Sequence, residues 1–338
     1  MSFLKISEKI VLNKLKKIKN GNLKLINYDG KVFHFGSLES NLSADIKINN
    51  PKFYFNIISG GSSALGEAHM NRDFYTSNLT NLIEISAKNI ELVYSFSGSL
   101  KIKKIKNFFK SIFASNTKSK SLHYISKHYD LGNNFFSKWL DKTLTYSSAV
   151  YENENDSLEI AQKNKYQKLI DLLNVKDGNK VLEIGCGWGG FSEYLAKNYN
   201  VSIDCITISK KQFEFTKKRI SDAGLNNKVN VLFLDYRDLQ DKYDKIVSIE
   251  MIEAVGENYL GKYFETIKKS LNKDGSAALQ GITIRDDLFD RYKRSEDFIQ
   301  KYIFPGGFLP SVNLMKTLIK KNKLNLIKVN SYLSGRLC

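Results

Sequence analysis

A glycine-rich turn is the first feature of this sequence that suggests chemistry. An acid and three glycines occupy every second position of it: Glu183, Gly185, Gly187 and Gly189. Glycines there permit a tight turn and let a ligand approach the backbone, and a helix that begins beside the turn points its N–H groups at that ligand. The turn lacks the later glycine that fits a pyrophosphate, and this form is typical of S-adenosylmethionine sites. A purely structural turn is the alternative.

Polar residues after the next two apolar runs would complete such a site. Asp204 stands at the distance expected of an acid that holds a ribose, but apolar residues follow it, so the strand runs past it. We prefer a polar set just beyond that strand for the ribose and the methionine end of the cofactor. Its members are Thr207, Ser209 and Gln212. Asp235 and Tyr236 close the third strand, where an adenine ring would lie.

Two carboxylates follow the fourth apolar run. Glu250 and Glu253 would face the place where the methyl group of the cofactor is presented. For either of them, the alternative is a solvated acid at the start of a helix. The residues alone leave open which of the two acts.

The elements that must position these residues alternate in type after about residue 175. Short apolar runs are separated by helical patterns, which predicts β-α units and a Rossmann-like parallel sheet with helices on both faces. Six predicted strands can be counted: residues 180–185, 201–208, 229–235, 243–250, 276–284 and 324–332. The fold class is therefore α/β, with the last strand close to the end of the chain.

The first third of the chain has a different pattern. Residues 3–18 have the spacing of an amphipathic helix, residues 23–58 alternate like short strands, including the stretch 52–58, and residues 74–98 return to a helical pattern. Residues 100–113 place apolar side chains at helical spacing and lysines on the other face, as in a helix that lies in a membrane interface. An ordinary packed helix is the alternative for that segment.

These patterns divide the chain into two predicted domains. We expect a smaller α+β domain over residues 1–113 that associates with lipid or membrane. Residues 114–121 are small and polar and form the predicted linker. The catalytic domain would then span residues 122–338.

Charge is concentrated on the first of these domains. The net charge is +17, with 45 Lys against 7 Arg, and residues 1–120 contribute +11 of it. Such a distribution suggests a polyanionic partner. Nucleic-acid readers rely on the bidentate contacts of Arg, whereas an anionic membrane surface needs only point charges. We therefore expect an anionic membrane as partner and no nucleic acid.

Cysteine usage and hydropathy indicate the compartment. Three scattered cysteines, Cys186, Cys205 and Cys338, cannot form a disulfide framework or a zinc site, so we expect a reducing environment and no metal. The N-terminus lacks the features of a signal peptide, and no apolar run approaches the ~18 residues that a membrane span needs. The expected location is cytoplasmic, peripheral on the inner face of the membrane.

Several motifs, in order, resemble the cyclopropane-fatty-acyl-phospholipid synthases, a family of class I S-adenosylmethionine-dependent methyltransferases that includes the mycolic acid cyclopropane synthases. They are HYDLGN (128–133), WLD (139–141), TYSSA (145–149), VLEIGCGWGG (181–190), TISKKQ (207–212), DYRDL (235–239), SIEMIEAVG (248–256) and YIFPGGFLPS (302–311). The resemblance covers about residues 55–311. It adds Tyr146, Ser147 and Cys186 to the predicted cofactor site. The methyltransferase sheet usually has seven strands, so we expect the seventh to be missing here.

The resemblance implies a reaction on lipid. A cis double bond in an unsaturated phospholipid acyl chain attacks the methyl group of S-adenosyl-L-methionine, and the carbocation loses a proton to close a cyclopropane ring. In the family, bound bicarbonate is the base, held by a Cys, a Glu, a His and a Tyr. Here Glu253 is retained, Ser148 replaces the Cys, Gln280 replaces the His, and the Tyr has no counterpart. We expect Glu253, Ser148 and Gln280 to be catalytic.

These departures keep other functions open. A fatty-acyl C-methyltransferase would leave a methyl or methylene branch instead of a ring. A methyltransferase of soluble small molecules and a catalytically impaired, lipid-binding relative are the further alternatives. The product, the lipid headgroup and the oligomeric state, a homodimer included, do not follow from the residues.

Overall fold

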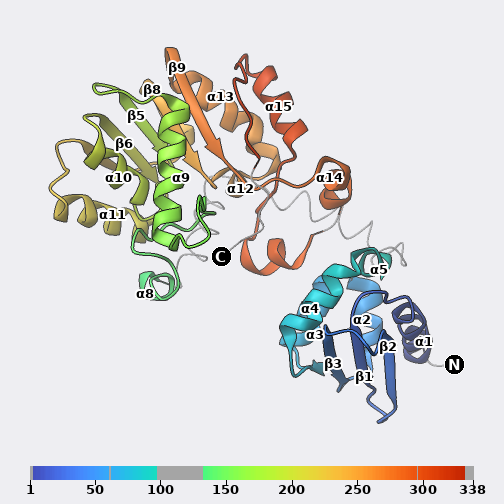
Figure 1. Cartoon of the computed structure of the whole chain (residues 1–338). Coiled ribbons are helices and arrows are strands. Elements are labelled where there is room, and N and C mark those ends of the chain that lie inside the picture. Colours follow the sequence, from blue (N-terminus) through green and yellow to red (C-terminus); the bar gives the residue numbers. More distant parts are fainter. Residues whose placement is uncertain (1–2, 61, 97–131, 295, 332–338) are drawn as a thin grey trace. The chain divides into compact units, whose positions relative to one another are not determined.

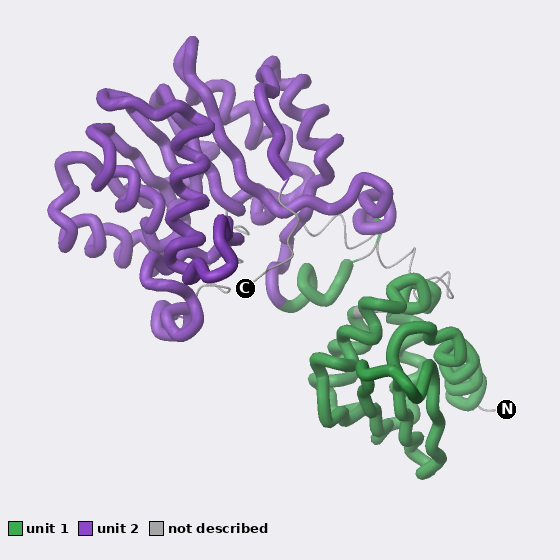
Figure 2. Tube along the Cα trace, in the orientation of Figure 1, with its two compact units in different colours: residues 1–113, 294–302 green, residues 114–293, 303–338 purple. Residues whose placement is uncertain are grey.

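The computed structural model describes residues 3–60, 62–96, 132–294 and 296–331. The chain divides into two compact units, as Figure 2 shows. Unit 1 comprises residues 1–113 and 294–302, and unit 2 comprises residues 114–293 and 303–338. The expected interfacial helix at 100–113, the linker at 114–121 and most of the HYDLGN motif lie outside the described residues.

Unit 1 is built on a four-stranded sheet with helices against it (Figure 1). The strands are β1 (Asn22–Ile26), β2 (Val32–Gly36), β3 (Ser43–Ile48) and β4 (Phe74–Tyr75), in the order β2-β1-β3-β4. The helices are α1 (Phe3–Leu15), α2 (Lys52–Gly60), α3 (Ser62–Met70), α4 (Leu79–Lys88) and α5 (Ile90–Phe96). β1 pairs antiparallel with β2 and parallel with β3, and alternate side chains of each strand enter one core.

The strand predicted over residues 52–58 is wrong, because this stretch is the helix α2. Its buried side chains, Phe53, Tyr54, Ile57 and Ile58, recur at helical spacing. Asn50 accepts a hydrogen bond from the Lys52 N–H at 3.0 Å, and Pro51 stands directly before the helix. The alternation of apolar and polar residues at its start resembles a strand, whereas the whole stretch has its buried residues on one face of a helix.

Unit 2 contains a parallel five-stranded sheet, which confirms the predicted α/β fold class. Its strands are β5 (Lys180–Ile184), β6 (Ser202–Thr207), β7 (Val229–Phe233), β8 (Tyr243–Ile249) and β9 (Leu271–Gln280). Their order is β7-β6-β5-β8-β9. The chain winds one way from β5 and then the other from β8, so a topological switch point lies at the carboxyl ends of β5 and β8.

Helices cover both faces of this sheet (Figure 1). One face packs on α9 (Leu158–Leu173), α10 (Gly190–Asn198) and α11 (Lys210–Asp222). The other packs on α13 (Leu260–Ser270) and α15 (Val312–Lys321). Apolar side chains from both sides of β5 therefore join two separate cores, so both faces of the sheet are covered and a ligand would have to bind at an edge of the sheet.

The sixth predicted strand does not form within the described residues. Residues 324–331 have no regular secondary structure. Leu324 packs against the core, but the later apolar side chains, Leu326, Ile327 and Val329, are exposed, with Ile327 87% exposed. A strand needs a neighbour that satisfies its backbone donors and acceptors, and no described strand pairs with this segment. Alternation alone is therefore not enough to predict a strand here.

Candidate functional site

The glycine turn leads from β5 into α10 at the switch point. Gly185, Gly187 and Gly189 all have left-handed backbone angles, with φ of +83°, +54° and +80°. A Cβ at Gly185 would lie 2.8 Å from Met251, and one at Gly189 would lie 2.5 Å from Thr216. A Cβ at Gly187 would meet nothing within 4 Å. Gly187 therefore needs glycine for its backbone angle alone, and it leaves open the face on which a ligand can approach.

Glu183 and Cys186 flank this turn from inside the protein. Glu183 is buried and accepts a hydrogen bond from the Ser192 hydroxyl of α10. Burial raises the pKa of the Glu183 carboxyl to about 8. Cys186 is also buried, its thiol pKa is raised by the neighbouring Cys205 and by burial, and its N–H donates to the Ile206 carbonyl at 3.0 Å. Both residues hold the turn in place; direct contact with a cofactor stays a prediction.

The polar set after β6 is assembled as a unit. The Thr207 hydroxyl donates to the Gln212 side-chain oxygen at 3.0 Å and accepts from the Ser209 N–H at 3.1 Å. Ser209 caps the N-terminus of α11. Asp204 instead lies in the middle of β6 and accepts from the Tyr243 hydroxyl at 2.9 Å. The preferred set thus lies at the carboxyl edge of the sheet and Asp204 does not, while ribose binding stays a prediction.

Asp235 and Tyr236 follow β7 on the same edge. Asp235 accepts hydrogen bonds from the Arg237 guanidinium at 2.8 and 2.6 Å. Tyr236 begins the short helix η1 (Tyr236–Asp238), and its ring packs edge-on against Tyr263. Burial raises the pKa of the Tyr236 hydroxyl to about 12. An adenine ring in this place would meet the ring of Tyr236, and adenine binding there stays a prediction.

An aromatic cluster joins the segment around Tyr146 to the glycine turn. Tyr146 packs against Phe136 of the short helix α8 (Asn133–Phe136), Trp139 and Phe304. Phe136 in turn lies 4.9 Å, between ring centroids, from Trp188. Burial raises the pKa of the Tyr146 hydroxyl, and the nearby Glu250 carboxylate raises it further. The TYSSA motif therefore meets the turn through ring contacts.

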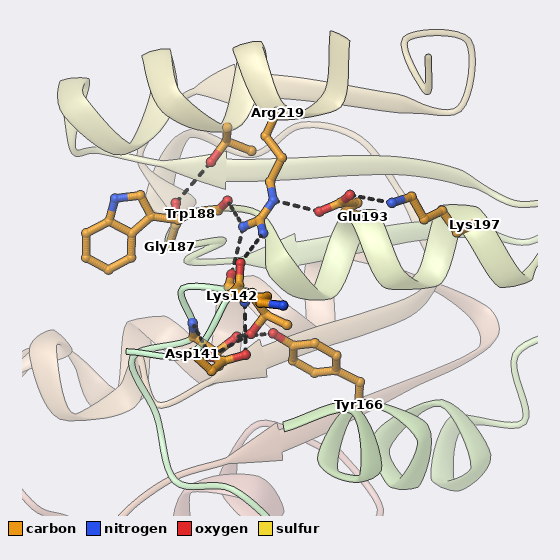
Figure 3. A network of polar contacts seen from close by, with 11 residues as sticks. Asp141, Lys142, Tyr166, Gly187, Trp188, Glu193, Lys197 and Arg219 are labelled. Carbon is orange, nitrogen blue, oxygen red and sulfur yellow. Dashed lines mark hydrogen bonds and ion pairs between the residues drawn. The ribbon is translucent and has the colours of Figure 1, made fainter. Parts of the chain in front are cut away.

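Arg219 of α11 ties the same two segments together by hydrogen bonds, as Figure 3 shows. Its Nη1 donates to the carbonyl oxygens of Thr143 and Trp188 at 2.7 and 2.9 Å. Its Nη2 donates to the Lys142 carbonyl at 3.0 Å, and its Nε forms an ion pair with Glu193 at 2.6 Å. One guanidinium thus spans three backbone carbonyls from two distant parts of the chain. No sequence pattern pointed to this residue.

Buried polar side chains of α9 hold the other side of the TYSSA motif. Lys165 donates to the Ser147 hydroxyl at 2.6 Å, and Gln162 donates to the Ser147 carbonyl at 2.8 Å. The Tyr166 hydroxyl bonds to the Thr145 hydroxyl. Lys165, Gln162 and Tyr166 are all about 1% exposed. Ser147 is therefore oriented by a buried cation, a feature that no sequence pattern indicated.

Ser148 and Gln280 are brought together, but by a residue outside the predicted catalytic set. The Glu250 carboxylate oxygen Oε1 accepts from the Ser148 N–H at 2.9 Å and from the Gln280 side-chain amide at 3.0 Å. The same amide also donates to the Ser148 carbonyl at 3.1 Å. Glu250 directly follows β8 and has a φ of +48°. Its place after a strand was the sequence signal for it.

Glu253 lies one turn further on, in the short helix α12 (Ile252–Val255). Its Oε1 accepts from the Ile282 N–H, and its backbone carbonyl accepts from the Phe308 N–H at 2.8 Å. Its Oε2 is buried and has no hydrogen-bond partner among the described residues. Burial raises the pKa of the Glu253 carboxyl to about 7, and the Glu250 charge also acts to raise it. Near neutral pH this carboxyl can therefore hold or release a proton.

Among the residues that the structure describes, no group of three or more His, Cys, Asp or Glu side chains is placed to hold a metal ion. Within the same residues, no helix is both long and apolar enough to cross a membrane.

Comparison with known proteins bears on this geometry. The model of the family described as mycolic acid cyclopropane synthetase matches residues 116–334. The cyclopropane-fatty-acyl-phospholipid synthase of Escherichia coli is 36% identical over 283 residues, which cover 82% of this chain and 69% of that protein. The tuberculostearic acid methyltransferase UfaA1 of Mycobacterium tuberculosis is 32% identical over 258 residues, 74% of this chain and 60% of that protein.

Solved structures agree with the sequence matches. The cyclopropane synthase MmaA2 from Mycobacterium tuberculosis superposes with a TM-score of 0.57 at 30% identity, over 61% of this chain and 76% of that one. The mycolic acid cyclopropane synthase CmaA1, complexed with SAH and CTAB, gives a TM-score of 0.56 at 29% identity, over 60% of this chain and 74% of that one.

Proposed function

The chain belongs to the mycolic acid cyclopropane synthetase family, and from this premise we propose that it is a cyclopropane-fatty-acyl-phospholipid synthase. It is an S-adenosylmethionine-dependent methyltransferase. The proposed acceptor is the cis double bond of an unsaturated acyl chain in a phospholipid, and the proposed product is a cyclopropane ring formed through a carbocation.

One observation carries this proposal beyond family membership. Two carboxylates, Glu250 and Glu253, lie near each other after β8, at the switch point, and Glu250 lies near Tyr146 and accepts from the amide of Gln280. An alkene gives up no proton before it is methylated, so its enzyme needs a proton acceptor only after the new bond forms. A carboxylate pair beside aromatic side chains supplies an acceptor together with apolar surroundings. This combination suits an acyl chain better than a polar small molecule.

The cofactor would be held by the residues around the glycine turn. We propose that the open face of Gly187 lets it approach the backbone, while Gly185 and Gly189 allow the turn to pack against Met251 and Thr216. Asp235 and Tyr236 would lie beside the adenine. The methionine end and the ribose would contact polar residues of the TYSSA motif and of the set after β6: Tyr146, Ser147, Thr207, Ser209 and Gln212. When bound, its sulfonium supplies an electrophilic methyl group. Glu183 and Cys186 act from behind by fixing the turn.

A branch-forming C-methyltransferase is the second candidate. The observation that favours it is the replacement of the family's Cys and His by Ser148 and Gln280, because the Ser148 backbone and the Gln280 side-chain amide contact each other and the Glu250 carboxylate. A relative with a methyltransferase name, UfaA1, shares 32% identity. The two candidates differ in product and not in the first bond formed.

The experiment is methylation of lipid vesicles. Purified protein is incubated with cofactor labelled in its methyl group and with vesicles of phosphatidylglycerol that carry either cis-unsaturated or saturated chains. We expect label in the unsaturated lipid only, and proton NMR of the extracted lipid separates ring protons from a methylene branch. Transfer to saturated lipid, or transfer only to soluble molecules of a cell extract, would contradict the proposed acceptor.

A further inference from the structure

The residues that should hold bicarbonate do not fit it in this chain. The Ser148 N–H and the Gln280 side-chain amide both donate to one oxygen of Glu250, at 2.9 and 3.0 Å. These two donors come from the positions that correspond to the family's Cys and His. A bound anion would have to displace the Glu250 carboxylate from them and then lie beside it. Like charges at such close range destabilise one another, so the site rejects a second anion.

The backbone of Glu250 is bent to deliver its carboxylate to these donors. A residue with a Cβ rarely adopts a φ of +48°. Such a conformation persists only where its surroundings impose it, and it is concentrated at functional sites. The Glu250 N–H donates to the Gln280 carbonyl at 2.9 Å, while the side chain caps no helix. The bend therefore serves the placement of the carboxylate between the 145–149 segment and the end of β9.

We propose that the Glu250 carboxylate occupies the position of the anion and is itself the base of the reaction. This inference rests on the proposed function. The alkene electron pair forms a bond to the methyl carbon as the carbon–sulfur bond breaks, and S-adenosylhomocysteine leaves. The resulting cation loses one proton to Glu250, and the electron pair of that C–H bond closes the ring. Glu250 then releases the proton to water.

The two carboxylates divide the work by their surroundings. Burial raises the pKa of Glu253 to about 7, and the Glu250 charge acts in the same direction. Glu253 therefore carries a proton in much of the protein near neutral pH, which keeps the second negative charge out of the site. Glu250 receives two hydrogen bonds from neutral donors, which hold its carboxylate oxygen Oε1 in place at the end of β9. Only one of the pair is then free to act as base.

The first test compares wild type with Glu250→Gln in buffer freed of carbon dioxide. A glutamine keeps the shape and can still accept from Ser148 and Gln280, but it cannot take a proton. Wild type should be fully active without bicarbonate, and Glu250→Gln should lose about 10²-fold or more in kcat. Its cofactor affinity, measured by calorimetry without lipid, should stay within about twofold. A wild type that needs bicarbonate, or an active Glu250→Gln, would overturn the inference.

The second test rebuilds an anion site. Glu250→Gly relieves the backbone, because glycine accepts a positive φ, and it frees both donors. This variant should be inactive without bicarbonate and regain activity as bicarbonate is added. Calorimetry should show bicarbonate binding to Glu250→Gly and none to wild type. Binding by wild type would contradict the occupied anion position.

The matched control is Glu257→Gln. Glu257 begins the short helix η2 (Glu257–Tyr259), beyond α12, and pairs with Lys293 at the surface. It should resemble wild type in every assay. A wild type that binds the cofactor but methylates no lipid would contradict the proposed function instead, and the bicarbonate calorimetry would still decide whether Glu250 fills the anion position.

Discussion

At the scale of single residues, Gly187 shows how a ligand site differs from a crowded turn. Gly185 and Gly189 are needed because neighbouring side chains leave no room for a Cβ, whereas the space beside Gly187 is open. Open space beside a backbone at the switch point is where a cofactor can lie against the chain. The predicted glycine spacing identified all three positions. It could not separate the glycine with an open face from the two glycines that pack against neighbouring side chains.

We predict that Gly187→Val abolishes cofactor binding. The valine side chain would fill the open face at a φ of +54°, so cofactor affinity should fall at least about tenfold in calorimetry. The control is Gly178→Val, because Gly178 has a φ of +85°, equally open surroundings and a position before β5. Both variants carry backbone strain, and only the first should lose the cofactor. Equal loss in both would mean that strain alone is responsible.

Glu183 predicts a pH dependence of stability. Burial raises the pKa of its folded-state carboxyl to about 8 from 4.5. The folded state therefore binds the proton more tightly than the unfolded state, so the stabilisation is complete below about pH 4.5 and is lost as the pH rises through about 8. Glu183→Gln should remove this decline in the free energy of unfolding. The decline is on the order of a few kcal/mol, because one pKa unit corresponds to about 1.4 kcal/mol. Urea unfolding at pH 5.5 and pH 8.5 measures the free energy of unfolding of wild type and of Glu183→Gln. An equal decline in both proteins would contradict the prediction.

At the scale of elements, α11 does more than cover the sheet. Its first residues carry the Ser209 cap and Gln212, and its last turns carry Arg219, which reaches the glycine turn and the segment before Tyr146. The ammonium group of a lysine has three N–H donors on one nitrogen, whereas the planar guanidinium group of an arginine has five N–H donors that point in different directions. Only the latter can span carbonyls from two segments and an ion pair at once. The helix was predictable from its periodicity; the function of its last turn was not.

We predict that Arg219→Lys loosens the TYSSA motif. Hydrogen exchange should become faster in peptides covering residues 141–150 and stay unchanged in β5 and β6. Cofactor binding should weaken about tenfold, because two or more charged hydrogen bonds are lost at roughly 1.5–3 kcal/mol each and a lysine restores only part of them. The control is Lys218→Gln, whose side chain is 76% exposed and pairs with Asp222 on the same helix. Faster exchange across the whole sheet would indicate a general loss of stability and contradict the positioning role.

At the scale of the whole molecule, local sequence patterns are sufficient to predict those elements whose structure depends mainly on their own residues. The parallel strands and the glycine turn follow from apolar runs and spacing, and the structure has them. The strand predicted at residues 52–58 is wrong, and the one predicted at residues 324–332 does not form in its described part, because a short alternating run becomes a strand only when a neighbour pairs with it. The bridge from Glu250 to Gln280 joins residues 30 positions apart, so no local pattern contains it.

Unit 1 is not made of one continuous stretch of the chain. The segment Arg294–Tyr302 belongs to unit 1, although residues on both sides of it belong to unit 2. Within unit 1 the Glu296 carbonyl accepts from the Ser63 hydroxyl at 3.1 Å, and Lys301 forms an ion pair with Glu67 at 2.5 Å. A division into consecutive domains cannot represent such a segment. The lipid-associating function assigned to residues 1–113 stays a prediction.

The net charge of +17 gives the last prediction, which concerns attachment to a membrane. Lysines near anionic headgroups contribute roughly 1 kcal/mol each, and salt screens them over a Debye length of about 10 Å at 0.1 M. The protein should sediment with phosphatidylglycerol vesicles at low salt, less at high salt, and hardly with phosphatidylcholine vesicles.

Replacing Lys101, Lys103, Lys104 and Lys106 by Gln, in the segment outside the described residues, should weaken binding to these vesicles roughly a hundredfold or more. The control replaces four lysines of the methyltransferase unit, Lys197, Lys218, Lys262 and Lys269, which already pair with acids on their own helices. If both quadruple variants lose affinity equally, total charge drives attachment, and the segment at residues 100–113 has no special part in it.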